Sequence, residues 1–156
     1  MNKIAIFADV QNIYYTTKEA YGRQFNYRKL WQKISDDGEI VSASAYAIDR
    51  NDPAQQKFQI ALQHIGFNVK LKPYIQRSDG SAKGDWDVGI TIDIMDTMNE
   101  VDVIILLSGD GDFDLLMQKA QSKGIRAEAY GVPTLSSHSL VQSVSRFHPI
   151  EDDLLL

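Results

Sequence analysis

An almost wholly apolar run, VDVIILL at residues 101–107, most narrows the folds that this chain can adopt. Apart from Asp102, every residue in it is valine, isoleucine or leucine, so both faces of a strand built from it would be apolar. Parallel strands that helices cover on both sides have this composition, whereas half-exposed antiparallel strands alternate apolar and polar residues. The run therefore predicts a central strand of a parallel sheet.

Four more β-branched or apolar runs alternate along the chain with segments whose apolar residues recur at spacings of three and four. The five expected strands span residues 3–8, 41–48, 68–74, 101–107 and 126–131. The five expected helices span residues 27–34, 53–65, 86–98, 112–123 and 136–146. This alternation predicts an α/β fold, a three-layer doubly wound sheet that is mainly parallel. We expect the strand order 3-2-1-4-5, which is usual for a fold of this kind.

The chain length of 156 residues fits one domain, which we place at residues 1–150, with 151–156 as an acidic and apolar tail. No apolar stretch reaches the roughly 18 to 20 residues of a bilayer-spanning helix. The start, MNKIAIFADVQN, reads as a strand rather than a signal peptide, so we expect no membrane partner. The absence of cysteine excludes disulfides and thiolate zinc sites and suits a reducing cytoplasm. Because 16 basic and 21 acidic residues give a net charge of −5, a nucleic-acid partner would need a local basic patch or bridging cations.

Acidic and polar side chains directly follow the first and fourth expected strands. The motif FADVQN brings Asp9 and Asn12 to the end of the first strand. The motif LLSGDGDFDLL brings four candidates to the end of the fourth strand, namely Ser108, Asp110, Asp112 and Asp114. Doubly wound sheets bind ligands beyond the carboxyl ends of the strands, where the strand order reverses. With the order 3-2-1-4-5, the two acidic strand ends are neighbours at that point.

A third acidic group lies in KGDWDVGITID, at the start of the expected helix 86–98 that precedes the fourth strand. It contains Asp85, Asp87 and Asp93. Asp87 shares a helix face with Ile90 and Ile94, so it lies at the end of the stripe that faces the core. Asp93 is about 240° around the helix axis from Asp87, so these two carboxylates do not share a face. We therefore rank Asp87 as the stronger ligand candidate and keep Asp85 and Asp93, together with Ser108, as secondary candidates.

The clustered aspartates favour a hard divalent cation over simple helix capping, because one cap needs only one acceptor. Two carboxylates about 5 Å apart repel by roughly 3 kcal/mol at an effective dielectric of 20, and a divalent cation reverses the sign of this interaction. The candidate ligands are carboxylates and amides, which favours Mg²⁺ or Mn²⁺ over zinc. A calcium EF-hand would need glycine and glutamate where Leu115 and Gln121 stand, so we exclude it. A phosphoacceptor aspartate would follow the third strand, where KPYIQRS has none.

The motifs FADVQN, KGDWDVGITID and SGDGDFDLL, in this order, resemble those of the NYN domain family, in its bacterial LabA-like branch within the PIN-like nuclease superfamily. The resemblance covers nearly the whole chain. It implies a PIN-like (Rossmann-like) fold, a pocket for Mg²⁺ or Mn²⁺ and ribonuclease activity. The positions that match the family's acidic site are Asp9, Asp87, Asp110 and Asp114, with Asn12 as the amide after the first strand. The further motif positions are Ser108, Asp112 and Asp93.

We therefore expect hydrolysis of RNA phosphodiester bonds at a divalent-metal site. The catalytic candidates are Asp9, Asn12, Asp87, Asp110 and Asp114. The candidate metal ligands are Asp9, Asp87, Asp110, Asp112 and Asp114. Two alternatives stay open: a catalytically silent module that binds RNA or protein, and a metal-dependent phosphoesterase that acts on small substrates.

Basic and aromatic side chains around the polar loop 74–85 are the candidate contacts to RNA. They are Lys70, Lys72, Arg77, Lys83 and Trp86, with Tyr74 as a second aromatic. The cations would attract phosphates, and the aromatic rings could stack on unpaired bases, which favours single-stranded RNA. The alternative for Trp86 is a place in the core. The sequence leaves the oligomeric state open, a homodimer included.

Overall fold

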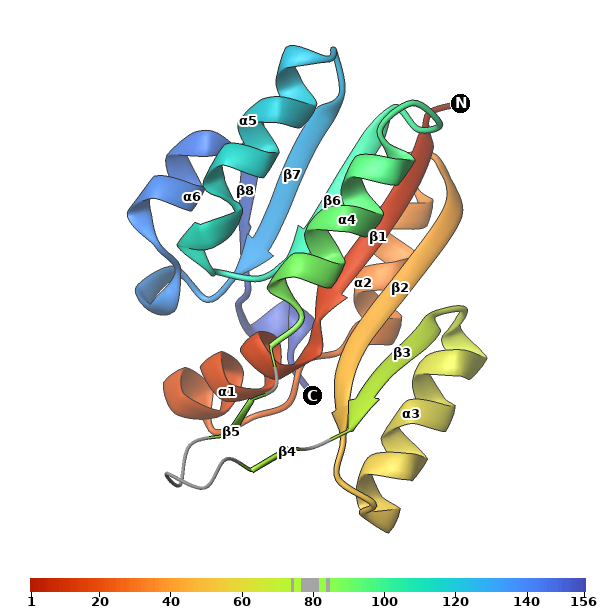
Figure 1. Cartoon of the computed structure of the whole chain (residues 1–156), viewed down its shortest axis with the longest axis vertical. Helices are drawn as coiled ribbons and strands as arrows, with labels where there is room; N and C mark the ends of the chain where they lie inside the picture. Colours follow the sequence, from red (N-terminus) through yellow and green to blue (C-terminus); the bar gives the residue numbers. More distant parts are fainter. Residues whose placement is uncertain (74, 77–81, 84) are drawn as a thin grey trace.

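A computed structural model describes residues 1–73, 75–76, 82–83 and 85–156 (Figure 1). Its main sheet has six strands in the order β3-β2-β1-β6-β7-β8, and every neighbouring pair is parallel. These strands are β1 (Lys3–Asp9), β2 (Glu39–Asp49), β3 (Asn68–Pro73), β6 (Val103–Leu107), β7 (Arg126–Gly131) and β8 (Arg146–Pro149). The three-layer, doubly wound fold and the expected order of the first five strands are confirmed. A separate antiparallel pair joins β4 (Ile75–Gln76) and β5 (Ala82–Lys83).

Helices cover both faces of the main sheet (Figure 1). One face carries α1 (Val10–Tyr21), α2 (Tyr27–Ser35) and α3 (Pro53–Ile65), and the other carries α4 (Asp87–Thr97), α5 (Asp114–Ser122) and α6 (His138–Ser143). Short 3-10 turns are η1 (Gly111–Phe113), η2 (Pro133–Leu135) and η3 (Asp152–Leu154). In the ranges that the structure describes, none of these helices is both long and apolar enough to cross a membrane.

Local capping signals explain where several of these helices begin and end. The side chain of Asp52 accepts a hydrogen bond from the backbone N–H of Ala54, and Pro53 opens α3 with its φ already suited to a helix. Gly66 and Gly124 follow α3 and α5 with φ of 134° and 81°, a region in which a side chain would be strained. The glycine and proline signals therefore predicted these helix ends correctly.

Two parts of the expected element pattern are wrong. The helix α1 is missing from the expected pattern, because the polar and tyrosine residues among its buried positions, Val10, Ile13 and Thr17, obscure their helical spacing in the sequence. The expected helix 136–146 ends at Ser143, and Arg146 already begins the sixth strand. This strand pairs with β7, and the His148 ring stacks on the Tyr130 ring with centroids 4.3 Å apart. Four residues of mixed polarity do not announce a strand, so tertiary pairing decided this element.

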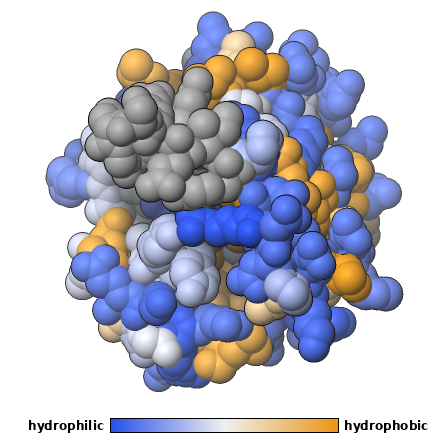
Figure 2. Space-filling view, turned by 60° about the horizontal axis from the view of Figure 1, so that its bottom comes forward, coloured by the Kyte–Doolittle hydropathy of each residue, from blue (hydrophilic) through white to orange (hydrophobic). Residues whose placement is uncertain are grey.

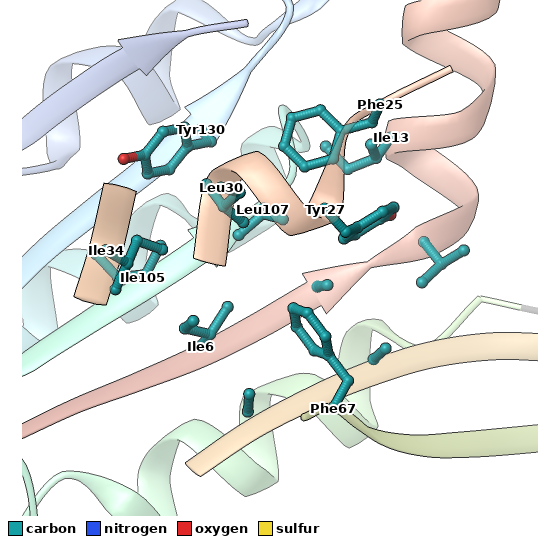
Figure 3. Close-up of a cluster of buried hydrophobic side chains, with 14 of the residues drawn as sticks. Ile6, Ile13, Phe25, Tyr27, Leu30, Ile34, Phe67, Ile105, Leu107 and Tyr130 are labelled. Carbon is teal, nitrogen blue, oxygen red and sulfur yellow. The ribbon is translucent and has the colours of Figure 1, made fainter. Parts of the chain in front are cut away.

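The sheet separates two apolar cores, one on each face. Figure 3 shows the first, in which Leu30 and Ile34 of α2 and Ile13 of α1 pack toward Ile6 and Ile105 of the central strands. The second core lies beneath α4, α5 and α6. Every residue of β6 is buried, as its apolar sequence predicted. With both faces of β1 and β6 buried, polar groups from these strands gather where the strands end.

The last residues fold back on the first core. Leu154 and Leu155 are buried, with 2% and 6% of their surface exposed. The backbone N–H of Asn26 donates to the Leu154 carbonyl, and the N–H of Leu156 donates to the Gln24 carbonyl. These backbone bonds fasten residues 151–156 to the connection between α1 and α2.

Candidate acidic metal site

The parallel pairing of β1 with β6 brings two acidic strand ends together. Asp9 is the last residue of β1 and also the N-cap of α1, where it accepts a hydrogen bond from the N–H of Asn12 at 3.4 Å. Ser108 follows β6 and donates its hydroxyl to Asp9 at 3.2 Å. Both side chains are buried, with exposed fractions of 8% for Asp9 and 0% for Ser108. The carboxylate of Asp9 therefore forms the floor of the site.

The turn after β6 is held by short polar contacts. The N–H of Asp110 donates to the Ser108 hydroxyl at 3.1 Å, and the N–H of Asp112 donates to the Asp110 carboxylate at 2.9 Å. The Asn12 side-chain carbonyl accepts from the N–H of Gly109 at 3.0 Å. Asn12 thus ties the first turn of α1 to the β6 turn. The contact to the backbone of Gly109 leaves no trace in the sequence.

Three carboxylates from two distant segments meet above Asp9. Asp87, Asp110 and Asp112 each offer an oxygen, and these three oxygens lie within 4.8 Å of one another. Asp87 is the first residue of α4, whereas Asp110 and Asp112 lie in the turn that leads into α5. The structure therefore brings together three of the five expected metal ligands, from segments more than 20 residues apart in the sequence, and a ligand role for Asp9 stays a prediction.

Trp86 anchors the start of α4 to the sheet and thereby places Asp87. Its indole N–H donates to the carbonyl of Ala47 on β2 at 2.9 Å, and its ring packs beside Tyr46 with centroids 5.3 Å apart. A Cβ atom at Gly89 would approach the Trp86 ring to 2.6 Å, so the ring needs a glycine at this point. Trp86 is thus half-buried and packs against the second core, and its stacking on RNA bases stays a prediction.

Electrostatics in the site favour protonated carboxyls as long as no cation is bound. Burial, opposed by the hydrogen bonds from Asn12 and Ser108 and reinforced by the charge of Asp110, raises the pKa of Asp9 to about 6. Burial, the hydrogen bond with Asp110 and the charges of Asp110, Asp85 and Asp9 raise the pKa of Asp87 to about 7. The cluster therefore resists carrying its full negative charge near neutral pH.

The donor set fits a hard divalent cation. Within the described part of the chain, no ion pair from lysine, arginine or histidine reaches Asp87, Asp110 or Asp112. A bound cation would therefore offset the mutual repulsion of these carboxylates. Carboxylate oxygens are preferred ligands of Mg²⁺ and Mn²⁺. Asp87, Asp110 and Asp112 can hold such an ion directly, with Asp9 beneath them.

Two predicted site residues lie apart from this cluster. Asp114 begins α5, and its carboxylate accepts a hydrogen bond from the N–H of Leu115 at 2.6 Å. Asp93 lies about one and two-thirds turns along α4 from Asp87 and accepts from Lys70 at 2.7 Å and from the Tyr46 hydroxyl at 2.6 Å. Burial works to raise the pKa of Asp93, but these two hydrogen bonds outweigh it and hold that pKa below its ordinary value. A ligand role for Asp114 or Asp93 stays a prediction.

A pocket of about 420 Å³ lies away from the acidic cluster, beside α4 and strands β1 to β3. Its polar lining residues are Lys3, Ser42, Ser44, Lys70, Asp93, Asp96, Thr97 and Glu100. Asp93 therefore belongs to the wall of this pocket, as its angular separation from Asp87 on the helix predicted. The Lys70–Asp93 ion pair was not foreseen, because its partners are 23 residues apart and join through the β2–β3 register.

The expected RNA contacts fall into two groups. Lys70 is committed to Asp93, and the Lys72 ammonium donates to the carbonyl of Asp85 at 3.1 Å and lies 4.5 Å from the centre of the Trp86 ring. Asp85 in turn accepts from the N–H of Asp87 at 3.1 Å, so Lys72 and Asp85 support the start of α4. Arg77 and Tyr74 lie outside the described residues, and for Lys83 only the backbone, in β5, is described.

Figure 2 turns the carboxyl ends of the strands toward the viewer. The visible surface there is mostly hydrophilic, and apolar side chains are scattered among polar ones. The acidic turn residues belong to this end of the sheet, since Asp110 and Asp112 follow β6 directly.

Comparison with known proteins finds relatives that match nearly the whole chain. The chain is 27% identical over 159 residues to the low amplitude and bright protein LabA of Synechococcus elongatus, an alignment that covers 97% of this chain and 85% of that protein. Among solved structures, a protein of unknown function from Vibrio parahaemolyticus is 52% identical, with a TM-score of 0.94 over 99% of this chain and 96% of the other.

A more distant similarity concerns the fold alone. Ribokinase from Giardia lamblia is 12% identical, with a TM-score of 0.52 over 97% of this chain and 58% of the ribokinase chain. At the level of sequence families, the match is nearly complete. The model of the NYN domain matches residues 3–151, and the chain therefore belongs to the NYN domain family.

Proposed function

We propose that this protein is a divalent-metal-dependent ribonuclease that hydrolyses phosphodiester bonds in single-stranded RNA. The observation that carries the proposal is the convergence of Asp87, Asp110 and Asp112 within 4.8 Å at the carboxyl end of the sheet. The family match adds support, because a PIN-like nuclease fold combined with an acidic cluster suits metal-assisted hydrolysis. The location in a reducing cytoplasm is part of the same proposal.

The chain's own residues would divide the work. Asp87, Asp110 and Asp112 would hold Mg²⁺ or Mn²⁺. The buried carboxylate of Asp9 would add a further negative charge that attracts the ion. A bound ion of this kind polarises the phosphate, lowers the pKa of water and stabilises the leaving oxygen. Asn12 and Ser108 would keep the β1 and β6 ends in register, through their contacts to Gly109 and Asp9.

Substitution of Asp110 by asparagine tests this proposal most directly. Asp110 makes two hydrogen bonds in the turn after β6: its N–H donates to the Ser108 hydroxyl, and its carboxylate accepts from the N–H of Asp112. We expect Asp110→Asn to abolish Mn²⁺ binding in calorimetric titration and to abolish cleavage of a fluorescently labelled single-stranded RNA. The matched control is Asp96→Asn on α4, an exposed carboxylate outside the cluster, which should leave both measurements unchanged.

The outcomes separate the competing functions. Full RNA cleavage by both Asp110→Asn and Asp9→Asn would contradict the assignment of the site. RNA binding by the wild-type protein without cleavage at any Mg²⁺ or Mn²⁺ concentration would favour a binding module. Hydrolysis of a model phosphomonoester without RNA cleavage would favour a phosphoesterase for small substrates.

A further inference from the structure

Two neighbouring tyrosines on α1 stand out on the surface near the acidic site. The exposed fractions of Tyr14 and Tyr15 are 46% and 49%. Among the aromatic side chains whose burial the structure describes, these two alone fall in the exposed class. Large apolar surface left in water needs a reason beyond folding when it is concentrated at one place. Because the two rings are adjacent on one helix, they are candidates for contact with a ligand.

The position of α1 links these tyrosines to the site. The helix begins at Val10, directly after the buried Asp9, and runs across the end of the sheet to which the strand arrowheads point (Figure 1). With a rise of 1.5 Å per residue, Tyr14 and Tyr15 lie about 8 to 9 Å along the helix from Asp9. A strand that leaves the acidic cluster along α1 would reach both rings within two or three nucleotides.

The local arrangement of the tyrosines suits stacking rather than core packing. Their rings meet edge to face, with centroids 5.4 Å apart and an interplanar angle of 75°. The ammonium of Lys18 lies 5.5 Å from the centre of the Tyr14 ring, so a positive charge accompanies the aromatic pair. The buried stripe of α1 is formed by Val10, Ile13 and Thr17, and the tyrosines are not needed to complete it.

The electrostatics of the chain explain why stacking would matter for binding a strand. The net charge is −5, and Lys70 and Lys72 are already engaged within the protein. These two lysines, the candidate cations whose side chains the structure describes, are therefore less available to attract phosphates, the usual source of nucleic-acid affinity. Aromatic stacking depends on base faces instead of net charge and contributes about 1–3 kcal/mol per base.

We propose that Tyr14 and Tyr15, with Lys18, form a stacking platform for unpaired bases of a nucleic-acid strand whose backbone lies at the acidic cluster. The proposal rests on the proposed function for the placement of the strand, but it concerns binding and not cleavage. Tyr14 and Tyr15 stack on bases through their ring faces, and Lys18 contacts a neighbouring phosphate.

The test measures binding of a fluorescent 12-nucleotide oligouridine by polarisation, with Ca²⁺ in place of Mg²⁺ so that the acidic cluster keeps a divalent cation while cleavage is suppressed. Tyr14→Ala and Tyr15→Ala should each weaken binding about 5- to 150-fold, which is the stacking contribution converted to affinity. Tyr14→Phe and Tyr15→Phe should retain the affinity, because phenylalanine keeps the ring face. Ile60→Ala, at an exposed apolar residue on α3, is the matched control and should change nothing.

An abasic strand of the same length separates stacking from general attraction. The alanine substitutions should not alter its affinity, whereas Lys18→Gln should lower the slope of log affinity against log salt by about 0.7 for either strand. The stacking platform alone would be overturned by either of two results. The alanine substitutions could lower the affinity for both strands equally, or they could leave the affinity for oligouridine unchanged. A wild-type protein that binds but never cleaves would overturn only the ribonuclease, and a protein that binds no oligouridine would overturn both.

Discussion

The buried carboxyl of Asp9 makes a sharp prediction about stability without metal. Asp9 is 8% exposed, and its pKa rises from 3.8 to about 6 in the folded protein. Between these values the folded state binds a proton that the unfolded state releases, so stability falls as the pH rises through this window. Above pH 6 the folded protein carries the full cost of a buried charge. From the pKa difference, that cost is about 3 kcal/mol.

Replacement of Asp9 by asparagine removes this charge at nearly constant volume. The amide oxygen can still accept from the N–H of Asn12, but the hydrogen bond from Ser108 is disturbed, which costs about 1 kcal/mol. We therefore expect Asp9→Asn to be more stable than the wild type by about 2 kcal/mol at pH 8 in EDTA. Below pH 4 this advantage should disappear, because the wild-type carboxyl is then protonated in both states.

Urea unfolding followed by circular dichroism at pH 4, 6 and 8 measures this difference. Saturating Mg²⁺ should reverse the order of stability at pH 8, because a ligand at 100 times its Kd stabilises its binding-competent protein by about 2.7 kcal/mol. Asp96→Asn, at an exposed carboxylate, should stay within about 0.5 kcal/mol of the wild type throughout. An Asp9→Asn variant that is less stable in EDTA at pH 8, or whose difference from the wild type ignores pH, would refute the reasoning.

Three further predictions concern how the site and fold are supported. Gly89→Ala places a Cβ atom against the Trp86 ring. We expect this change to lower the free energy of unfolding in urea by about 1–3 kcal/mol and to weaken Mn²⁺ binding in calorimetry. Unchanged values would contradict the role of Trp86 in placing Asp87. Leu154→Ala should lower the free energy of unfolding by about 2–5 kcal/mol, because Leu154 is 2% exposed. Leu156→Ala should lower it by less than about 0.5 kcal/mol, because Leu156 is 65% exposed. Equal effects of the two substitutions in thermal unfolding would contradict a buried C-terminal segment. Lys70 and Tyr46 hold the pKa of Asp93 below its ordinary value, so the stability that this carboxylate contributes is lost as the pH falls. We therefore expect the destabilisation caused by Lys70→Met to shrink in acid. A difference in urea midpoints that does not change with pH would argue against the ion pair.

Much of the fold followed from local patterns in the sequence. The apolar run that became β6 predicted a strand buried on both faces, and β6 is buried throughout. Asp52 and Gly66 marked the start and end of α3 through cap chemistry that involves only neighbouring residues. The strand order came from a general rule for doubly wound sheets, and the register of β1 with β2 and β6 confirms it.

The candidate site could be predicted only in part, for a geometrical reason. Asp110 follows β6 and therefore had to lie near the end of β1, where Asp9 is found. The sequence alone ranked Asp114 above Asp112 as a companion of Asp110. In the structure, the oxygen of Asp112 joins the cluster, and Asp114 bonds to its own helix. Which of the two aspartates joins the cluster depends on the turn geometry of η1, where a step of two residues rotates the direction of a side chain by about 240°.

The sequence by itself determined the strand–helix alternation, the central apolar strand and the acidic character of the strand ends, because periodicity and turn chemistry act over a few residues. The tertiary structure decided which carboxylates meet, the pairing of Lys70 with Asp93 and the exposure of Tyr14 and Tyr15. These outcomes depend on how distant segments pack, and on burial that raises the pKa of Asp9 and Asp87. Charge, distance and desolvation exist only once the sheet has brought the segments together.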